Sequence, residues 1–294
     1  MKNLFSIFPF SLISSIPPIP IYFFILQSLF LIQLIFVLPA FSQTSANEYL
    51  GSGNFKLLSE DYMGALEDFN KAIKLEKNDA GAYYARGIVK TELEDYKGAI
   101  FDYNIALWLN QLDNSWVYYR RGYVKGKLGN YLEALYDYNE SIRLNPDIID
   151  AYYQRGILKF ELKNYTRAIE DFNKTIEHKP DCAEAYYKRG ISKSKLGDKI
   201  GALHDYNKSL GINPDITDVY LQRGILKLSL RNYSRAIEDF DKAIDINPYY
   251  ADAYYNRGIA KNKLSDKDDA CLDWNIALDL AHELAYDRIE QYCK

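Results

Sequence analysis

The chain has 294 residues, with 36 Lys and Arg against 40 Asp and Glu, which gives a net charge of −4 at neutral pH. Lys2 is the only charged residue among the first 42, so the remaining 35 basic residues stand against all 40 acidic ones and residues 43–294 carry a net charge of −5. This balance excludes a general nucleic-acid-binding surface, and three cysteines are too few for a disulfide framework.

The first 42 residues form an apolar segment at the amino terminus. The run from Ile21 to Leu38 holds 18 residues without a charge, which is long for a signal peptide and just long enough to span a membrane. Two alternatives stay open: a signal peptide that is cleaved near Ser42, or an uncleaved anchor that crosses the membrane through residues 21–38. Because Lys2 and the amino terminus are the only positive charges before the run, we expect an extracytoplasmic location for the rest of the chain, secreted, periplasmic or membrane-anchored.

From residue 46 onward the sequence repeats itself with a period of 34 residues. An Arg-Gly pair recurs six times, and Ser52-Gly53 occupies the same position one period before the first pair. One step, from Gly87 to Gly122, is 35 residues long, which predicts one extra residue in the loop near residues 111–114. Such a fixed period is typical of stacked-repeat proteins. The six pairs begin at Arg86, Arg121, Arg155, Arg189, Arg223 and Arg257.

Each unit is predicted to be a helical hairpin. In the fourth unit Ala168, Phe172 and Ile176 recur at a spacing of four, as on one apolar face of a helix. A polar turn at residues 163–164 separates this helix from the one before it. A proline follows the second helix at a constant phase in four units and ends it, because proline lacks a backbone N–H. These prolines are Pro146, Pro180, Pro214 and Pro248.

The pattern resembles the tetratricopeptide repeat family, whose units run from an aromatic residue to a small residue, a second aromatic residue and a proline. All seven units have Ala at the small position of the second helix, from Ala65 to Ala270, and an aromatic residue four positions later. The resemblance implies an all-α, right-handed superhelical solenoid of helical hairpins with a short capping helix, and no cofactor. The expected units are 46–79, 80–114, 115–148, 149–182, 183–216, 217–250 and 251–284, followed by the capping helix at 285–294.

The glycine of the Arg-Gly pair and the alanine of the second helix have a packing role in this prediction. Small residues at Gly156 and Ala168 let the two helices of a hairpin approach closely, and the aromatic ring of Phe172 fills the remaining space. A large side chain at Ala168 is expected to overpack the site.

An Arg and a Lys four residues later recur on the first helix, where the family usually has Leu and Tyr. Two like charges at this spacing share a helix face and repel each other, so an acidic partner is expected nearby. One Asp on the second helix of each unit supplies it. We predict a structural ionic ladder between the two helices, in preference to an anion-binding strip. Its central members are Arg155, Lys159, Asp171, Arg189, Lys193, Asp205, Arg223, Lys227 and Asp239.

A second group of residues is rich in tyrosine. By the geometry that the resemblance implies, the first helices line the concave side of the solenoid, where tyrosine rings and hydroxyls suit peptide or protein recognition. The alternative is that the same rings pack between neighbouring first helices. The candidate partner-binding residues, named here the tyrosine trough, are Tyr84, Tyr119, Tyr123, Tyr153, Tyr187 and Tyr255.

The cysteines allow one disulfide near the carboxyl terminus. Cys182 falls in a loop between units, Cys271 on the second helix of the last unit and Cys293 on the helix that follows. In an oxidising compartment the last two are candidates for a bridge. Buried free thiols are the expectation, because no spacing here is diagnostic of a pair.

No residues have the spacing of a catalytic or metal site. His178, His204 and His282 fall at unrelated phases of the repeat. The sequence therefore predicts a non-catalytic scaffold or adaptor that binds a protein or peptide, without metal, cofactor or nucleic acid. The alternative is an accessory subunit of an envelope enzyme or a glycan-binding protein, in which the tyrosine trough would contact sugar rings.

Overall fold

The computed structural model describes residues 45–293, and within this range the chain is entirely helical apart from short loops. The predicted signal or anchor segment lies outside the described residues. None of the described helices is long and apolar enough to cross a membrane. Seven helices of 13 or 14 residues form the first half of each unit. They are α2 (Ala46–Leu58), α4 (Ala80–Glu92), α6 (Asn114–Lys127), α8 (Ile149–Glu161), α10 (Ala183–Lys195), α12 (Thr217–Ser229) and α14 (Ala251–Lys263).

Each first helix is followed by a second helix of similar length that packs against it. The last pair is followed by a single shorter helix, α16 (Leu284–Tyr292). The second helices are α3 (Tyr62–Leu75), α5 (Tyr96–Leu109), α7 (Tyr131–Leu144), α9 (Tyr165–His178), α11 (Lys199–Ile212), α13 (Tyr233–Ile246) and α15 (Lys267–Asp279).

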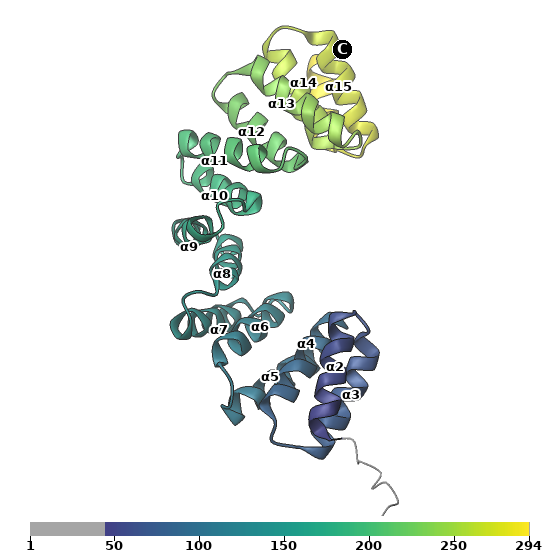
Figure 1. Ribbon diagram of the computed structural model, residues 1–294. Helices are drawn as coiled ribbons and strands as arrows, with labels where there is room; N and C mark the ends of the chain where they lie inside the picture. Colours follow the sequence, from purple (N-terminus) through teal and green to yellow (C-terminus); the bar gives the residue numbers. More distant parts are fainter. Residues whose placement is uncertain (1–44, 294) are drawn as a thin grey trace, which may run out of the picture.

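The seven hairpins stack into a curved solenoid (Figure 1). In the middle of the curve, first helices such as α6 and α8 lie on the inner side, and second helices such as α7 and α9 lie on the outer side. Each second helix also packs against the first helix of the next unit, so the apolar core is a continuous seam along the stack. This arrangement confirms the predicted all-α solenoid of hairpins.

Local sequence sets the ends of these helices. Asp61 and Asp198 cap second helices by accepting hydrogen bonds from the N–H groups of Gly64 and Gly201. Pro146 follows α7 by two residues, as predicted. The extra residue was expected in the loop near residues 111–114, but it lengthens the start of α6 to give 14 residues where the other first helices have 13.

Glycine and alanine recur at the same positions of successive units because the two helices of each hairpin approach closely there. A Cβ atom at Gly156 would lie 2.9 Å from Cε1 of Phe172, and one at Gly224 would lie 2.6 Å from Cε1 of Phe240. Ala168 is fully buried. The second-helix aromatic ring of each hairpin therefore rests directly on the backbone of the first helix, and only glycine leaves room for it.

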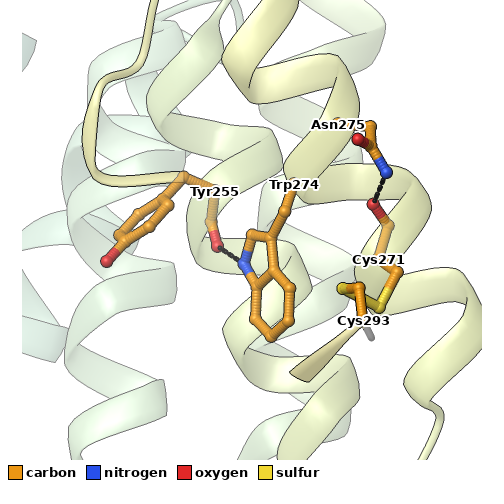
Figure 2. The surroundings of a disulfide bond; sticks show 5 residues. All are labelled: Tyr255, Cys271, Trp274, Asn275 and Cys293. Carbon is orange, nitrogen blue, oxygen red and sulfur yellow. Dashed lines mark hydrogen bonds between the residues drawn. A yellow bond between two sulfur atoms is a disulfide. The ribbon is translucent and has the colours of Figure 1, made fainter. Parts of the chain in front are cut away.

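The helix α16 folds back onto α15 and covers the end of the stack. Its Ala285 is fully buried in a cluster with Trp274 and Ala277. The expectation that Cys271 and Cys293 are free thiols is wrong, because they form a disulfide (Figure 2). The return of α16 brings the two Cα atoms to 5.8 Å although 22 positions separate them in sequence. The spacing of the two cysteines did not indicate this pair, because their approach depends on the turn before α16.

Candidate functional site

The ladder predicted from the Arg, Lys and Asp residues is assembled in three dimensions between the two helices of each hairpin. In the fourth unit, Arg155 donates from Nε and Nη2 to the two carboxylate oxygens of Asp171, at 3.0 and 2.6 Å. Lys159 Nζ lies 2.7 Å from Oδ2 of the same carboxylate. Asp171 is only 2% exposed, so its charge is compensated almost entirely by these two cations.

The same arrangement recurs in six of the seven units. The first unit differs because Ser52 stands where the others have Arg, and its hydroxyl donates to Asp68 at 2.6 Å while Lys56 Nζ lies 2.7 Å from the same carboxylate. The Arg–Asp pairs with Nη2 to Oδ1 distances of 2.6–2.7 Å are Arg86–Asp102, Arg121–Asp137, Arg155–Asp171, Arg189–Asp205, Arg223–Asp239 and Arg257–Asp273.

Each of these arginines also reaches back to the preceding unit, which the sequence analysis did not predict. Arg155 Nη1 donates to Oδ1 of Asn139, on the second helix of the unit before, at 2.7 Å. The repeated triplet of Asp, aromatic residue and Asn was the available signal. The acceptors along the stack are Asn70, Asn104, Asn139, Asn173, Asn207 and, for the last arginine, Asp241.

The ladder therefore joins hairpins to one another as well as closing each hairpin. All three nitrogens of the Arg155 guanidinium donate within the chain, and its Cζ lies 5.5 Å from the ring centroid of Tyr152. A group with its donors directed inward in this way is poorly placed to bind an external anion. The geometry favours a structural role for the ladder.

The tyrosine trough is half-buried on the first helices. The rings of Tyr84, Tyr119, Tyr153 and Tyr187 each lie tilted against the second-helix aromatic ring of their own unit, with centroids 6.1–6.2 Å apart. Tyr255 instead stacks on His282 at 4.1 Å. These rings thus pack within their own hairpins, and Tyr84, Tyr119 and Tyr187 also pack against core clusters that include residues of the next first helix.

Burial changes the pKa of the tyrosine hydroxyls in the trough. It raises the pKa of Tyr153 to about 12, with smaller contributions from Cys182 and Glu184. Burial likewise raises the pKa of Tyr84, Tyr119 and Tyr187. The hydroxyls are therefore neutral at physiological pH and act as hydrogen-bond donors as well as acceptors.

Acidic residues near the trough have partners from the end of their own unit. Lys179 Nζ lies 2.6 Å from Oδ1 of Asp150, and the hydroxyl of Tyr250 donates to Oδ1 of Asp218 at 2.5 Å. At the carboxyl end His282 Nε2 lies 3.1 Å from Oδ1 of Asp252. These contacts reduce the free negative charge of the inner face.

Tyr123 is placed differently from the other trough residues. It lines a cavity of about 210 Å³ between α6, α7 and α8, together with Tyr131 and Tyr138. Within residues 45–293, no group of three or more His, Cys, Asp or Glu side chains is arranged to hold a metal ion. The trough and this cavity offer contacts to another molecule.

The helical hairpins, their stacking and their small-residue contacts define a class of proteins, the stacked-repeat solenoids. Family models described as tetratricopeptide repeat match residues 115–148, 149–182 and 183–216, and one described as TPR repeat matches residues 228–265. The part of the chain between residues 115 and 265 thus consists of tetratricopeptide repeats. No curated protein sequence matches it.

Several solved structures have the same fold. The C-terminal part of a TPR repeat-containing protein from Cytophaga hutchinsonii is 21% identical, with a TM-score of 0.66 over 80% of this chain and 97% of that one. A tetratricopeptide repeat protein from Parabacteroides merdae is 23% identical, with a TM-score of 0.59 over 85% and 99%. YrrB, described as a TPR protein with an unusual peptide-binding site, is 25% identical, with a TM-score of 0.57 over 63% and 95%.

Proposed function

We propose that the protein is a non-catalytic scaffold or adaptor that binds a protein or peptide partner along the inner face of its solenoid, outside the cytoplasm. The observation that carries this proposal is the curved stack, in which first helices such as α6 and α8 lie on the inner side. The first helices carry half-buried tyrosines, and α6 and α8 line the cavity. Tyrosine supplies rigid contact area with a polar tip, and a groove of this kind accommodates an extended chain.

The likeness to YrrB supports a peptide ligand, since that protein is described as having a peptide-binding site. The geometry of the trough gives less support to the sugar-binding alternative. A sugar stacks on an open ring face, but the rings of Tyr84 and Tyr187 lie against Tyr103 and Tyr206.

The extracytoplasmic location rests on the disulfide between Cys271 and Cys293 together with the apolar amino-terminal segment. Disulfides persist in oxidising compartments and are rare in the cytosol. Fractionation of cells that make the native protein, with intact-mass determination of its amino terminus, tests this location. A chain starting near Gln43 in a soluble extracytoplasmic fraction indicates a cleaved signal, and a full-length chain in the membrane fraction indicates an anchor. Recovery from the cytosol would overturn the proposed location.

Site-specific photo-crosslinking tests the proposed binding face. A photoreactive residue at Gln222 of α12, at the phase of the cavity-lining Gln154, probes the proposed binding face, and one at the exposed Glu238 of α13 serves as a matched control. The full-length protein should crosslink to a partner from Gln222 and not from Glu238. Crosslinks from Glu238 alone would place binding on the outer face, and none from either position would contradict a scaffold role.

A further inference from the structure

The third unit lacks a side chain that the fourth unit has at the equivalent position. In the fourth unit, Phe160 packs edge-on against Tyr165, with centroids 5.6 Å apart, and Lys188 Nζ lies 5.0 Å from the Phe160 ring centroid. One repeat earlier these three positions are Gly126, Tyr131 and Gln154. All three line the cavity of about 210 Å³. The cavity thus lies where the ring of Phe160 lies in the next unit.

Neither the backbone nor the packing requires glycine at position 126. A Cβ atom there would have Leu158 Cδ2 as its nearest neighbour, at the ordinary contact distance of 3.8 Å. At Gly122, one turn earlier, a Cβ would lie 3.1 Å from both Asp137 and Tyr138. Gly122 is therefore explained by helix packing, and Gly126 is not.

The hydroxyl of Tyr138 lacks the side-chain partner that the second unit supplies. In the second unit the hydroxyls of Tyr103 and Thr91 lie 3.0 Å apart and form a hydrogen bond. The third unit has Tyr138 and Gly126 at those positions, so the partner hydroxyl is missing. Tyr138 is 2% exposed and lines the cavity, and its hydroxyl is not among the buried unpaired atoms of residues 45–293, so solvent in the cavity reaches it. A ligand that fills the cavity displaces this solvent, which favours a ligand that supplies an acceptor to the hydroxyl.

The size and polarity of the cavity restrict the ligand. Pockets for drug-sized molecules occupy roughly 300–1,000 Å³, so a cavity of about 210 Å³ suits a single side chain. Its apolar wall includes Ile157 and Leu158, while the exposed Lys127 and Glu161 at its edge can contact polar backbone. Burial raises the pKa of Tyr138, so this hydroxyl stays neutral and able to donate.

We propose that this cavity binds a tyrosine side chain of a peptide partner, whose ring takes the place that Phe160 fills in the next unit. The phenol oxygen enters first and accepts a hydrogen bond from Tyr138, and the ring lies between Tyr131 and Gln154. This inference rests on the proposed peptide-binding function and names the side chain that the groove selects. A phenylalanine side chain would fill the cavity but would leave the Tyr138 hydroxyl without a hydrogen-bond acceptor.

Saturation-transfer NMR on the full-length protein tests the site with N-acetyltyrosinamide, and N-acetylphenylalaninamide serves as the matched probe. One neutral hydrogen bond of about 1 kcal/mol corresponds to about fivefold in affinity. The tyrosine probe should therefore bind about fivefold more tightly than the phenylalanine probe. Equal affinities would overturn the role of Tyr138, and absence of saturable binding of either probe would overturn the site.

Substitutions test whether the two probes bind in this cavity. Gly126→Phe restores the residue of the fourth unit and should abolish saturable binding of both probes. Tyr138→Phe should remove the preference for tyrosine, whereas Tyr206→Phe, at the same phase of the fifth unit and outside this cavity, should leave it unchanged. Binding that survives Gly126→Phe would place it elsewhere and overturn the proposal.

The reverse substitution in the fourth unit should create a second cavity that binds the probes. Phe160→Gly should open an equivalent cavity in the fourth unit, which has Phe172 in place of Tyr138 and should therefore take the two probes about equally. If neither probe binds in the cavity, a partner can still crosslink at Gln222. The tyrosine site and the scaffold role are therefore tested independently. Crosslinking that fails while the tyrosine probe binds would overturn the scaffold role alone.

Discussion

Arg155 binds both carboxylate oxygens of Asp171 across the hairpin of α8 and α9, while its third nitrogen binds Asn139 of the preceding unit. One side chain therefore closes its own hairpin and fastens it to its neighbour. In a solenoid, stability is the sum of repeat and interface contributions. An arginine that serves both is expected to couple the folding of adjacent units.

Removal of Asp171 should destabilise the protein more than removal of Arg155. Asp171→Ala leaves two cations beside an apolar site without their partner, and breaking a buried pair in this way costs about 3–5 kcal/mol. Arg155→Ala leaves the carboxylate paired with Lys159 at 2.7 Å and should cost less. Urea unfolding of the two single variants and the double variant measures the coupling free energy, expected at about 1–3 kcal/mol. A coupling of zero would contradict the ladder.

The first unit should lose stability in acid. Burial would raise the pKa of Asp68, but hydrogen bonds from Lys56 and Ser52 outweigh it and hold the pKa below its ordinary value of 3.8. The folded-state pKa is the lower one, so the stabilisation is complete above pH 3.8 and is lost as the pH falls through the folded-state value. Hydrogen exchange in α2 and α3 between about pH 6 and about pH 2 should show this loss.

Asp68→Asn provides the control for the acid effect. The amide does not titrate in this range, so the variant should be less stable at neutral pH and its hydrogen exchange should lack the additional acid-dependent step. The same acid dependence in both proteins would assign the effect to other carboxylates.

Two glycines on equivalent helices should respond to alanine with opposite signs. Gly224→Ala places Cβ 2.6 Å from Phe240 and should cost about 1–3 kcal/mol by overpacking. Gly126→Ala places Cβ at the ordinary contact distance of 3.8 Å from Leu158 Cδ2 and should stabilise the protein by about 0.5–1 kcal/mol, because alanine loses less backbone entropy in a helix. Thermal unfolding of both variants measures the difference. Destabilisation by Gly126→Ala would show that the glycine has a packing role.

Reduction of the disulfide should loosen the cap. The bond between Cys271 and Cys293 closes a loop of 22 positions, and a loop of this length is worth about 3 kcal/mol. The Cys271→Ser/Cys293→Ser variant should unfold at lower temperature and show faster hydrogen exchange in α16, with the central units unchanged. Alkylation without reductant should label Cys182 alone among the cysteines, and labelling of all three would contradict the bridge.

Much of the fold could be predicted because the same residue types recur at the same position of successive units. Ala168, Phe172 and Pro180 repeat at a fixed phase, and a repeated phase fixes which face of a helix is buried before any coordinate is known. The Arg155–Asp171 contact followed from the same phase, since two like charges on one helix face require a nearby opposite charge.

The sequence by itself therefore determined the period, the hairpins, the small residues at their contacts and the residue types of the ladder, because these depend on local periodicity. Only the tertiary structure decided that Arg155 reaches Asn139, that Cys271 meets Cys293, and that Gly126 leaves a cavity beside Tyr138. Those features depend on the distance and angle between successive units and on the return of α16. A periodic pattern carries no information about either, since both arise from how whole helices pack.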